Sequence, residues 1–171
     1  MSEKIILGID PGTQVTGYGI IVCKGNSFHA LDYGCIRPPR NALLSDRYFI
    51  IFESLAELFK TYTPAEVAIE TPIIAKNAQS ALKLGCAQGV AIIQAKKHKV
   101  QIFGYSPTQI KCAITGTGKA SKTQLQGAVA RFLHLAKLPQ PQDASDALAC
   151  ALCHAHSSLS LLFSKLVSRE I

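Results

Sequence analysis

The sequence predicts an α/β domain in which a mixed central sheet is flanked by helices. Apolar, β-branched segments separated by turn residues dominate the first third, and helical and strand patterns alternate from residue 42 onward. The length of 171 residues, 48% of them hydrophobic, suits one domain with an ample core. We therefore expect a single domain over residues 1–157 and a loosely held C-terminal tail over residues 158–171.

Three strand segments open the chain, over residues 5–10, 17–23 and about 30–36. Pro11-Gly12 and Lys24-Gly25-Asn26 lie between them and are typical turn sequences. This short spacing predicts an antiparallel meander.

Helix and strand alternate in the middle of the chain. Apolar residues recur at helical spacing from Ala42 to Tyr62, and Pro64 follows just beyond. Val67-Ala68-Ile69 then has the pattern of a short buried strand that ends at Glu70. A further helix and strand are expected over residues 76–98 and 100–105.

Helix-start signals mark the last third. Ser106 precedes Pro107, and Ser121 follows a glycine-rich loop at residues 115–118. We expect both serines to be N-caps, with Pro107 at the first helical position. The helix after Ser121 is expected to end near Lys137.

Four carboxylates form the candidate catalytic and metal-binding site. Asp10 and Glu70 follow predicted buried strands, and open α/β sheets bind ligands at the carboxyl ends of their strands. Asp143 and Asp146 lie three residues apart in a helix expected over about residues 142–156, so their side chains share one face. The chain has only 11 acidic residues against 18 Lys and Arg. A cluster of acids would raise its own pKa values unless a multivalent cation neutralised it.

This donor set favours a magnesium-dependent nuclease. Carboxylate oxygens are the ligands that Mg²⁺ prefers, and two ions can activate a water and stabilise the leaving oxygen of a phosphodiester. Asp10 is the best candidate to bridge both ions, because its strand is expected to be central. The net charge of +7 favours a nucleic-acid partner. As an alternative, Asp143 is only a helix-start residue and Asp146 its solvated neighbour.

Other motifs suggest different chemistry. Residues 8–13 also resemble the first phosphate loop of actin-like ATPases, but 171 residues are too few for the two lobes that such enzymes need. Residues 116–120 lack the hydroxyl residue that follows the lysine of a P-loop. Residues 150–154 spell a haem-attachment motif, although their place inside a helix favours buried cysteines.

The cellular setting is expected to be the cytoplasm, without a membrane partner. No apolar stretch approaches the ~18 residues of a membrane span. The N-terminus leads directly into a strand rather than a signal peptide. The six cysteines are scattered through apolar contexts, so we expect reduced core residues.

A row of small residues follows one face of the helix expected over residues 76–98. Ala81, Gly85 and Gly89 are four residues apart, which places them on one side. Glycine inside a helix costs about 1 kcal/mol relative to alanine. The row therefore indicates close approach by another backbone, either the sheet or a second copy of the same helix.

Three groups of motifs, in a fixed order from residue 5 to 156, carry a family resemblance. They are Ile6-Leu7-Gly8-Ile9-Asp10-Pro11-Gly12 with Val15-Thr16-Gly17-Tyr18-Gly19, Ala75-Lys76-Asn77 with Ser80-Ala81-Leu82-Lys83-Leu84-Gly85, and Asp143-Ala144-Ser145-Asp146-Ala147-Leu148-Ala149. Together these motifs closely resemble the bacterial RuvC family of Holliday-junction resolvases.

The resemblance implies an RNase H-like fold and a homodimer that cuts two opposed strands of a four-way DNA junction by paired symmetric nicks, in recombination and DNA repair. It implies two Mg²⁺ per subunit, with Mn²⁺ able to substitute, and the RuvA and RuvB branch-migration complex as partner. The implied catalytic and metal-binding residues are Asp10, Glu70, Asp143 and Asp146, and the implied dimer residues are Ala81, Gly85 and Gly89.

Basic residues are expected to contact DNA. Lys111, Lys119 and Lys122 flank the glycine-rich loop, and Lys122 matches a family lysine near the scissile phosphate. Lys76 and Lys83 are further candidates for backbone contacts. In the segment Thr71-Pro72-Ile73-Ile74, relatives commonly carry an aromatic residue for contact with junction bases. Ile73 or Ile74 is expected to wedge between bases with weaker stacking.

Two other functions compete with resolution. One is junction binding without cleavage, in which the acids are structural. The other is an RNase H-like nuclease with another substrate, such as the RuvC-related proteins linked to RNA processing. The middle motif around Lys83 argues for the resolvase.

Overall fold

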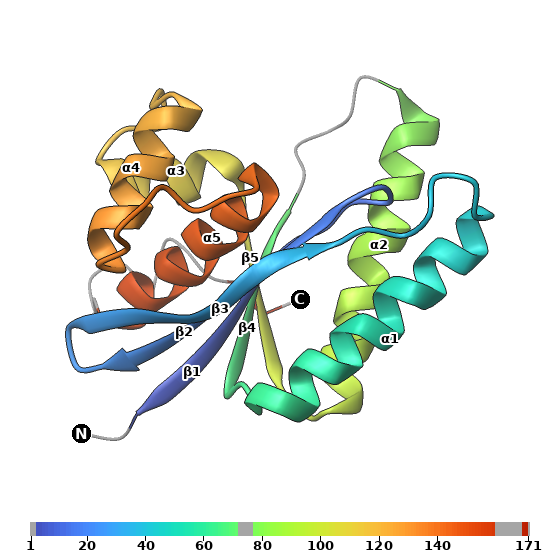
Figure 1. Cartoon of the computed structure of the whole chain (residues 1–171), viewed down its shortest axis with the longest axis horizontal. Coiled ribbons are helices and arrows are strands. Elements are labelled where there is room, and N and C mark those ends of the chain that lie inside the picture. Colours follow the sequence, from blue (N-terminus) through green and yellow to red (C-terminus); the bar gives the residue numbers. More distant parts are fainter. Residues whose placement is uncertain (1–2, 72–76, 160–168, 171) are drawn as a thin grey trace.

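A mixed sheet forms the centre of the molecule in the computed structural model, which describes residues 3–71, 77–159 and 169–170. The sheet has six strands in the order β3-β2-β1-β4-β5-β6 (Figure 1). β1 pairs antiparallel with β2 and parallel with β4, which confirms the predicted mixed α/β architecture. The strands are β1 (Lys4–Asp10), β2 (Thr16–Lys24), β3 (Ser27–Ile36), β4 (Glu66–Glu70), β5 (Gln101–Tyr105) and β6 (Arg169–Glu170).

The first three strands form the predicted antiparallel meander. In its register Asp10 is paired with Gly17. On the other side of β1, Ile9 is paired with Ile69 of the parallel strand β4. Asp10 and Glu70 therefore leave the sheet at the same edge, which is the carboxyl edge of its parallel strands.

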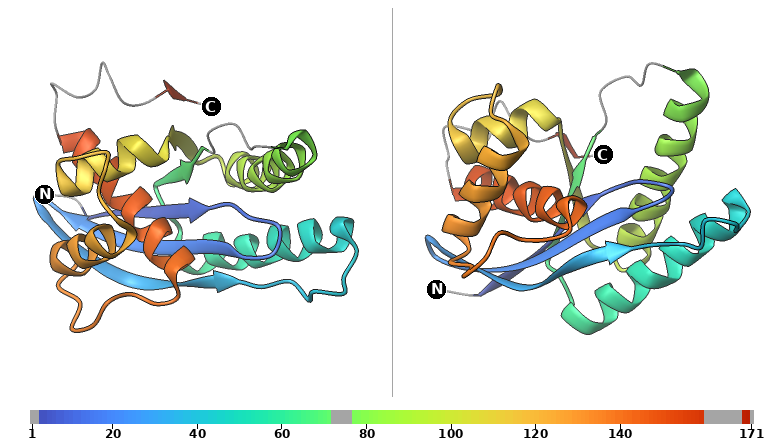
Figure 2. Two further views of the ribbon diagram at one scale, coloured as in Figure 1. Left: turned by 90° about the horizontal axis from the view of Figure 1, so that it is seen from above. Right: turned by 45° about the horizontal axis from the view of Figure 1, so that its top comes forward.

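Helices cover both faces of the sheet (Figures 1 and 2). α1 and α2 lie on one face, and α3, α4 and α5 lie on the other. The helices are α1 (Leu44–Tyr62), α2 (Ala78–Lys97), α3 (Pro107–Thr115), α4 (Lys122–Phe132) and α5 (Gln142–Leu159).

The two layers explain why the strands have continuous apolar runs. In β1, Ile6 packs in the core beneath α5 while its neighbour Leu7 packs in the core beneath α1 and α2. Ala68 and Val67 of β4 divide between the two cores in the same way. A strand that is buried on both faces needs apolar residues at every position rather than at alternate ones.

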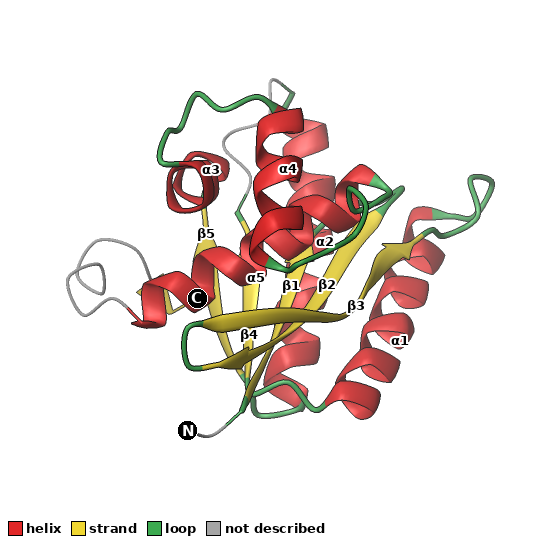
Figure 3. Ribbon diagram, turned by 60° about the vertical axis from the view of Figure 1, so that its left-hand side comes forward, coloured by secondary structure: helices red, strands yellow, loops and turns green. Residues whose placement is uncertain are grey.

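α5 lies directly on β1 and β2, with α3 and α4 packed outside it (Figure 3). Glycines make this close approach possible. A Cβ atom added to Gly8 would lie 2.0 Å from the Ala147 carbonyl oxygen, and one added to Gly17 would lie 2.0 Å from the Asp143 carbonyl oxygen. At Gly19 the added atom would meet the Leu148 side chain at 2.8 Å.

The predicted N-caps are confirmed. Ser106 and Ser121 each accept a hydrogen bond from the backbone N–H three residues later, and Gln109 and Gln124 bond back in two capping boxes. Pro107 occupies the first turn of α3. These signals are local in sequence, which is why they could be recognised without the fold.

α4 ends at Phe132, about five residues before the expected end. His134 adopts a left-handed conformation with φ 53°, and the Leu135 N–H donates to the Ala130 carbonyl in a Schellman-type bond. Leu133 and Leu135 both pack on the core as a result. Residues two apart cannot share one face of a continuing helix, so the turn is the solution that places both of them inside.

The C-terminal segment contributes an element that was not expected. β6 pairs antiparallel with β5, with Gly104 opposite Arg169 and Phe103 opposite Glu170. α5 also continues to Leu159, three residues beyond the expected end.

Among the described residues, no helix is long and apolar enough to cross a membrane.

The expectation of six core cysteines was wrong for part of the set. Cys150 and Cys153 are fully buried, but Cys86 and Cys112 are exposed on the outer surfaces of α2 and α3. An apolar sequence context did not distinguish a helix face that meets the core from one that faces outward. All six thiols are free.

Candidate active site

The four predicted acids lie in one region, at the carboxyl edge of the sheet. Asp10 is the last residue of β1 and Glu70 the last residue of β4. Asp143 and Asp146 lie at the start of α5. All four side chains are partly buried.

Seating of α5 on the glycines places the helical acids beside the strand acids. The Asp143 carbonyl lies against Gly17, which is the cross-strand partner of Asp10. One turn later, the Ala147 carbonyl lies against Gly8 of β1. A larger residue at either glycine would lift the start of α5 and its acids from the sheet.

Electrostatic coupling shows that the acids interact. Burial, together with the negative charges of Glu70, Asp146 and Asp143, raises the pKa of Asp10 to about 8. Burial and the charge of Asp146 raise the pKa of Glu70 to about 7. The pKa of Asp146 is also raised, mainly by burial. The carboxylates are thus crowded and lack full compensation from the protein.

Two lysines supply part of that compensation. Lys122, at the start of α4, lowers the pKa values of Asp10, Glu70 and Asp146, opposing the effect of burial. Lys111 of α3 acts in the same direction on Glu70 and Asp146. The structure therefore brings both lysines to the acid region.

The other predicted DNA contacts are exposed or lie outside the described residues. Lys119 is exposed in the loop between α3 and α4. Lys83 lines a cavity of about 500 Å³ together with Arg47 and with Thr13 from the loop after β1. Ile73 and Lys76 fall in the segment 72–76, which is outside the described residues.

The chemistry of the donor set fits a hard divalent cation. Carboxylate oxygens are the ligands of Mg²⁺, and Mg²⁺ keeps several waters rather than a complete protein cage. Within residues 3–71, 77–159 and 169–170, no group of three or more His, Cys, Asp or Glu side chains is close enough to hold a metal ion by itself. Burial and then neighbouring carboxylates raise the pKa values of Asp10 and Glu70, and a bound cation would stabilise their charged forms.

The haem-like motif at residues 150–154 belongs to the core, as expected. Cys150 and Cys153 are fully buried in α5, and His154 is 4% exposed. Both ring nitrogens of His154 are hydrogen-bonded, one to Tyr105 and the other to Glu66. This histidine is therefore engaged by the protein itself.

An unpartnered face lies on α2. Apart from the adjoining residues and nearby backbone of α2 itself, no heavy atom of the described chain lies within 4 Å of the positions that Cβ atoms would take on Gly85 and Gly89. The alternative that the sheet approaches these glycines is thus wrong. Leu82 and Ile93 are 69% and 62% exposed on the same side, with exposed Cys86 between them. We call Leu82, Gly85, Cys86, Gly89 and Ile93 the α2 stripe.

Sequence reasoning missed two structural features of the site. One is the role of Gly8, Gly17 and Gly19, whose spacing along two paired strands was the available signal. The other is the hydrogen bonding of His154 to residues 49 and 88 positions away, for which the sequence gave no signal.

The mixed sheet, the acids at its carboxyl edge and the acid-bearing helix α5 define the class of protein, which has an RNase H-like fold. A family model described as crossover junction endodeoxyribonuclease RuvC matches residues 6–154. The chain therefore belongs to the RuvC family.

Similar proteins extend over nearly the whole chain. The crossover junction endodeoxyribonuclease RuvC of Protochlamydia amoebophila is 49% identical over 154 residues, covering 90% of this chain and 92% of the relative. The protein of the same name from Shewanella loihica is 49% identical over 158 residues, covering 92% and 90%. Among solved structures, T. thermophilus RuvC in complex with a Holliday junction substrate aligns with a TM-score of 0.90 and 27% identity, over 98% of this chain and 99% of that one.

Proposed function

We propose that the protein is a crossover junction endodeoxyribonuclease, which resolves Holliday junctions by paired symmetric nicks in two opposed DNA strands. The observation that carries this proposal is the placement of four carboxylates in one region, at the ends of β1 and β4 and the start of α5, in a chain with net charge +7. A structural role alone does not account for acids placed where they raise one another's pKa. Membership of the RuvC family supports the choice of substrate.

Asp10, Glu70, Asp143 and Asp146 would hold two Mg²⁺ ions per subunit, with Mn²⁺ able to substitute. Divalent cations in such a site, when bound, supply activation of water and neutralisation of charge at the phosphodiester. Because Asp10 and Glu70 have raised pKa values, their deprotonation and cation binding are coupled.

The basic residues would hold and orient the DNA. Lys122 and Lys111 lie near enough to influence the acids electrostatically, so we assign them to the phosphates at the cleavage position. Lys119 and Lys83, which are exposed, and Lys76 would bind the backbone further away. We keep Ile73 as a base-contacting residue.

We further propose a homodimer formed through the α2 stripe and adjoining Ala81. The stripe combines exposed apolar side chains with two glycines that no described atom approaches, which suits close packing against an identical helix. An isologous dimer carries two identical sites, and a four-way junction offers two equivalent strands. From family membership we infer that the single-domain subunits act in the cytoplasm with the RuvA and RuvB branch-migration complex.

The proposal is tested with a synthetic four-way junction and a linear duplex of matched sequence. Wild type is incubated with each DNA in Mg²⁺ and in chelator, beside Asp146→Asn. Asp46→Asn is the matched control, because Asp46 is an exposed acid in the first turn of α1. We expect paired nicks in the junction alone, lost in chelator and in Asp146→Asn but kept in Asp46→Asn.

Retention of junction binding by Asp146→Asn would assign the loss to cleavage. Binding without nicks by wild type, across metals and junction sequences, would refute the nuclease and leave a junction-binding protein.

A further inference from the structure

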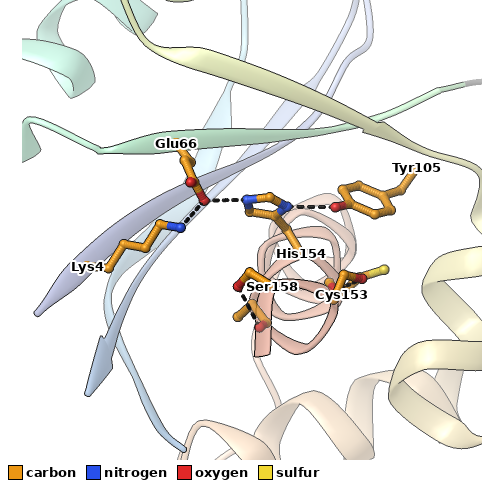
Figure 4. Close-up of polar contacts among 8 residues, drawn as sticks. Lys4, Glu66, Tyr105, Cys153, His154 and Ser158 are labelled. Atoms are coloured by element: carbon orange, nitrogen blue, oxygen red, sulfur yellow. Dashed lines mark hydrogen bonds and ion pairs between the residues drawn. The ribbon is translucent and has the colours of Figure 1, made fainter. Parts of the chain in front are cut away.

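A buried hydrogen-bonded chain crosses the interface between α5 and the sheet (Figure 4). His154 Nδ1 lies 2.6 Å from the Tyr105 hydroxyl oxygen, and His154 Nε2 lies 2.6 Å from Glu66 Oε2. Lys4 forms an ion pair with the same Glu66 oxygen. The His154 ring also stacks on Phe103, with ring centroids 4.4 Å apart. These contacts join α5 to β1, β4 and β5.

One proton arrangement satisfies every member of the chain. The Tyr105 hydroxyl donates to Nδ1 of His154, and the Nε2–H donates to the Glu66 carboxylate. Burial raises the pKa of the Tyr105 phenol, so it remains a donor. Burial alone would raise the pKa of Glu66, but hydrogen bonds from His154 and Lys4 and the charge of Lys4 lower it, so it remains an anionic acceptor.

The hydrogen-bonded chain lies at one end of the pair formed by α5 and β4, and the acids lie at the other end. Glu66 and Glu70 are four residues apart on β4, so their side chains point to the same face. His154 follows Asp143 by eleven residues, which is about three helical turns, so both lie on the sheet side of α5. The close contact of Asp143 with Gly17 holds the first end, and the His154 bonds hold the second.

A second anchor matters because the acids repel one another. Asp10 and Glu70 end β1 and β4, and the two helical acids lie at the start of α5, so like charges meet across this contact and push α5 away from the two strands. Tilting of α5 would relieve that repulsion only by breaking the bonds of His154, a group that is 4% exposed. A buried charged hydrogen bond is expensive to leave unmade, so the chain opposes the tilt.

We infer that the Tyr105–His154–Glu66 chain positions α5 so that Asp143 and Asp146 face Asp10 and Glu70 at the separation that cation binding requires. This inference rests on the proposed nuclease function. His154 is buried, bonds through both ring nitrogens to Tyr105 and Glu66, and acts through the helix, so it is a positioning residue.

The decisive comparison is Tyr105→Phe against Tyr62→Phe. Tyr105→Phe removes one hydroxyl from the chain and keeps the buried ring. Tyr62→Phe is the matched control, since it removes a hydroxyl that donates to Asp32 at 2.8 Å and keeps a partly buried ring that packs against the core beneath α1 and α2. Three quantities are measured for each variant: the Mg²⁺ concentration that gives half-maximal nicking, the rise in Tm on adding Mg²⁺ without DNA, and the junction Kd in chelator.

We expect Tyr105→Phe to raise the half-saturating Mg²⁺ concentration about 10-fold, as for groups that orient metal ligands. The Mg²⁺-induced rise in Tm should shrink, while the junction Kd stays within about twofold of wild type. Tyr62→Phe should have a lower Tm than wild type but the same half-saturating Mg²⁺ concentration for nicking.

Variants of Glu66 separate positioning from general stability. Glu66→Gln keeps an acceptor for the His154 Nε2–H and should stay near the wild-type Mg²⁺ dependence, whereas Glu66→Leu should resemble Tyr105→Phe. Equal Mg²⁺ dependence of wild type and Tyr105→Phe would overturn the inference and leave the chain with a role in stability only. Absence of nicking by wild type would instead refute the proposed function.

Discussion

Substitution of Gly17 by alanine tests how the helical acids reach the sheet. Gly17 is the cross-strand partner of Asp10, and α5 begins directly above it. The substitution adds a single methyl group, changes no charge and removes no hydrogen bond. Any loss of activity would therefore report the position of α5.

The expected displacement follows from the contact distances. The added Cβ would lie 2.0 Å from the Asp143 carbonyl oxygen and 2.5 Å from its carbonyl carbon. Because contacts under 3.0 Å are essentially never seen for a Cβ atom, the start of α5 must move by about 1 Å or more. Overpacking of this kind costs about 1–3 kcal/mol of unfolding free energy, and a 1 Å misplacement of catalytic groups costs about 100-fold in rate.

The assay is single-turnover nicking of a four-way junction at saturating Mg²⁺, with Tm measured in parallel. We expect Gly17→Ala to remain folded and to cut about 100-fold more slowly. Gly127→Ala is the control, because Gly127 lies in α4 with nothing within 4 Å of the added atom. That variant should gain up to about 1 kcal/mol of stability and cut at the wild-type rate. A Gly17→Ala protein that folds and cuts like wild type would refute the seating of α5 on this glycine.

Three further predictions concern charge and assembly. Since the pKa of Asp10 is raised from 3.8 to about 8, the folded state binds more protons than the unfolded state in that window, and metal-free stability should fall as pH rises through it. Asp10→Asn should flatten this fall in Tm measured in chelator, and an unchanged slope would contradict the assigned shift. Gly85→Ala combined with Gly89→Ala should raise the helix stability of the monomer by up to about 2 kcal/mol while weakening the dimer in sedimentation; a stronger dimer would exclude the α2 stripe as the interface. Lys122→Ala should reduce the slope of log Kd against log salt by about 0.9, the value for one phosphate contact, and an unchanged slope would remove Lys122 from the DNA interface.

Local signals in the sequence account for most of the elements that were predicted correctly. Continuous apolar runs around Ile6 and Val67 marked strands buried on both faces, and the serine caps at Ser106 and Ser121 marked helix starts. Each signal depends on neighbours within a few residues. The predicted end of α4 was wrong, because the turn at His134 depends on core contacts that the helical pattern of the sequence does not reveal.

The small-residue row of α2 shows a mixed outcome. Its spacing predicted close approach of another backbone but left the sheet and a second helix as alternatives. Only the folded chain excluded the sheet, since no described atom lies within 4 Å of the added Cβ positions at Gly85 and Gly89. The same face exposes Cys86, which its apolar sequence context had suggested to be buried.

The sequence by itself determined the family and the α/β class and predicted the four acids, because strand ends, helix spacing and ordered motifs are properties of short segments. The tertiary structure alone decided how α5 is seated on Gly8 and Gly17 and what His154 contacts. His154 bonds to Glu66, 88 residues earlier in the chain, and to Tyr105, 49 residues earlier. Strand order and helix placement create such pairs, and no local pattern of side chains encodes them.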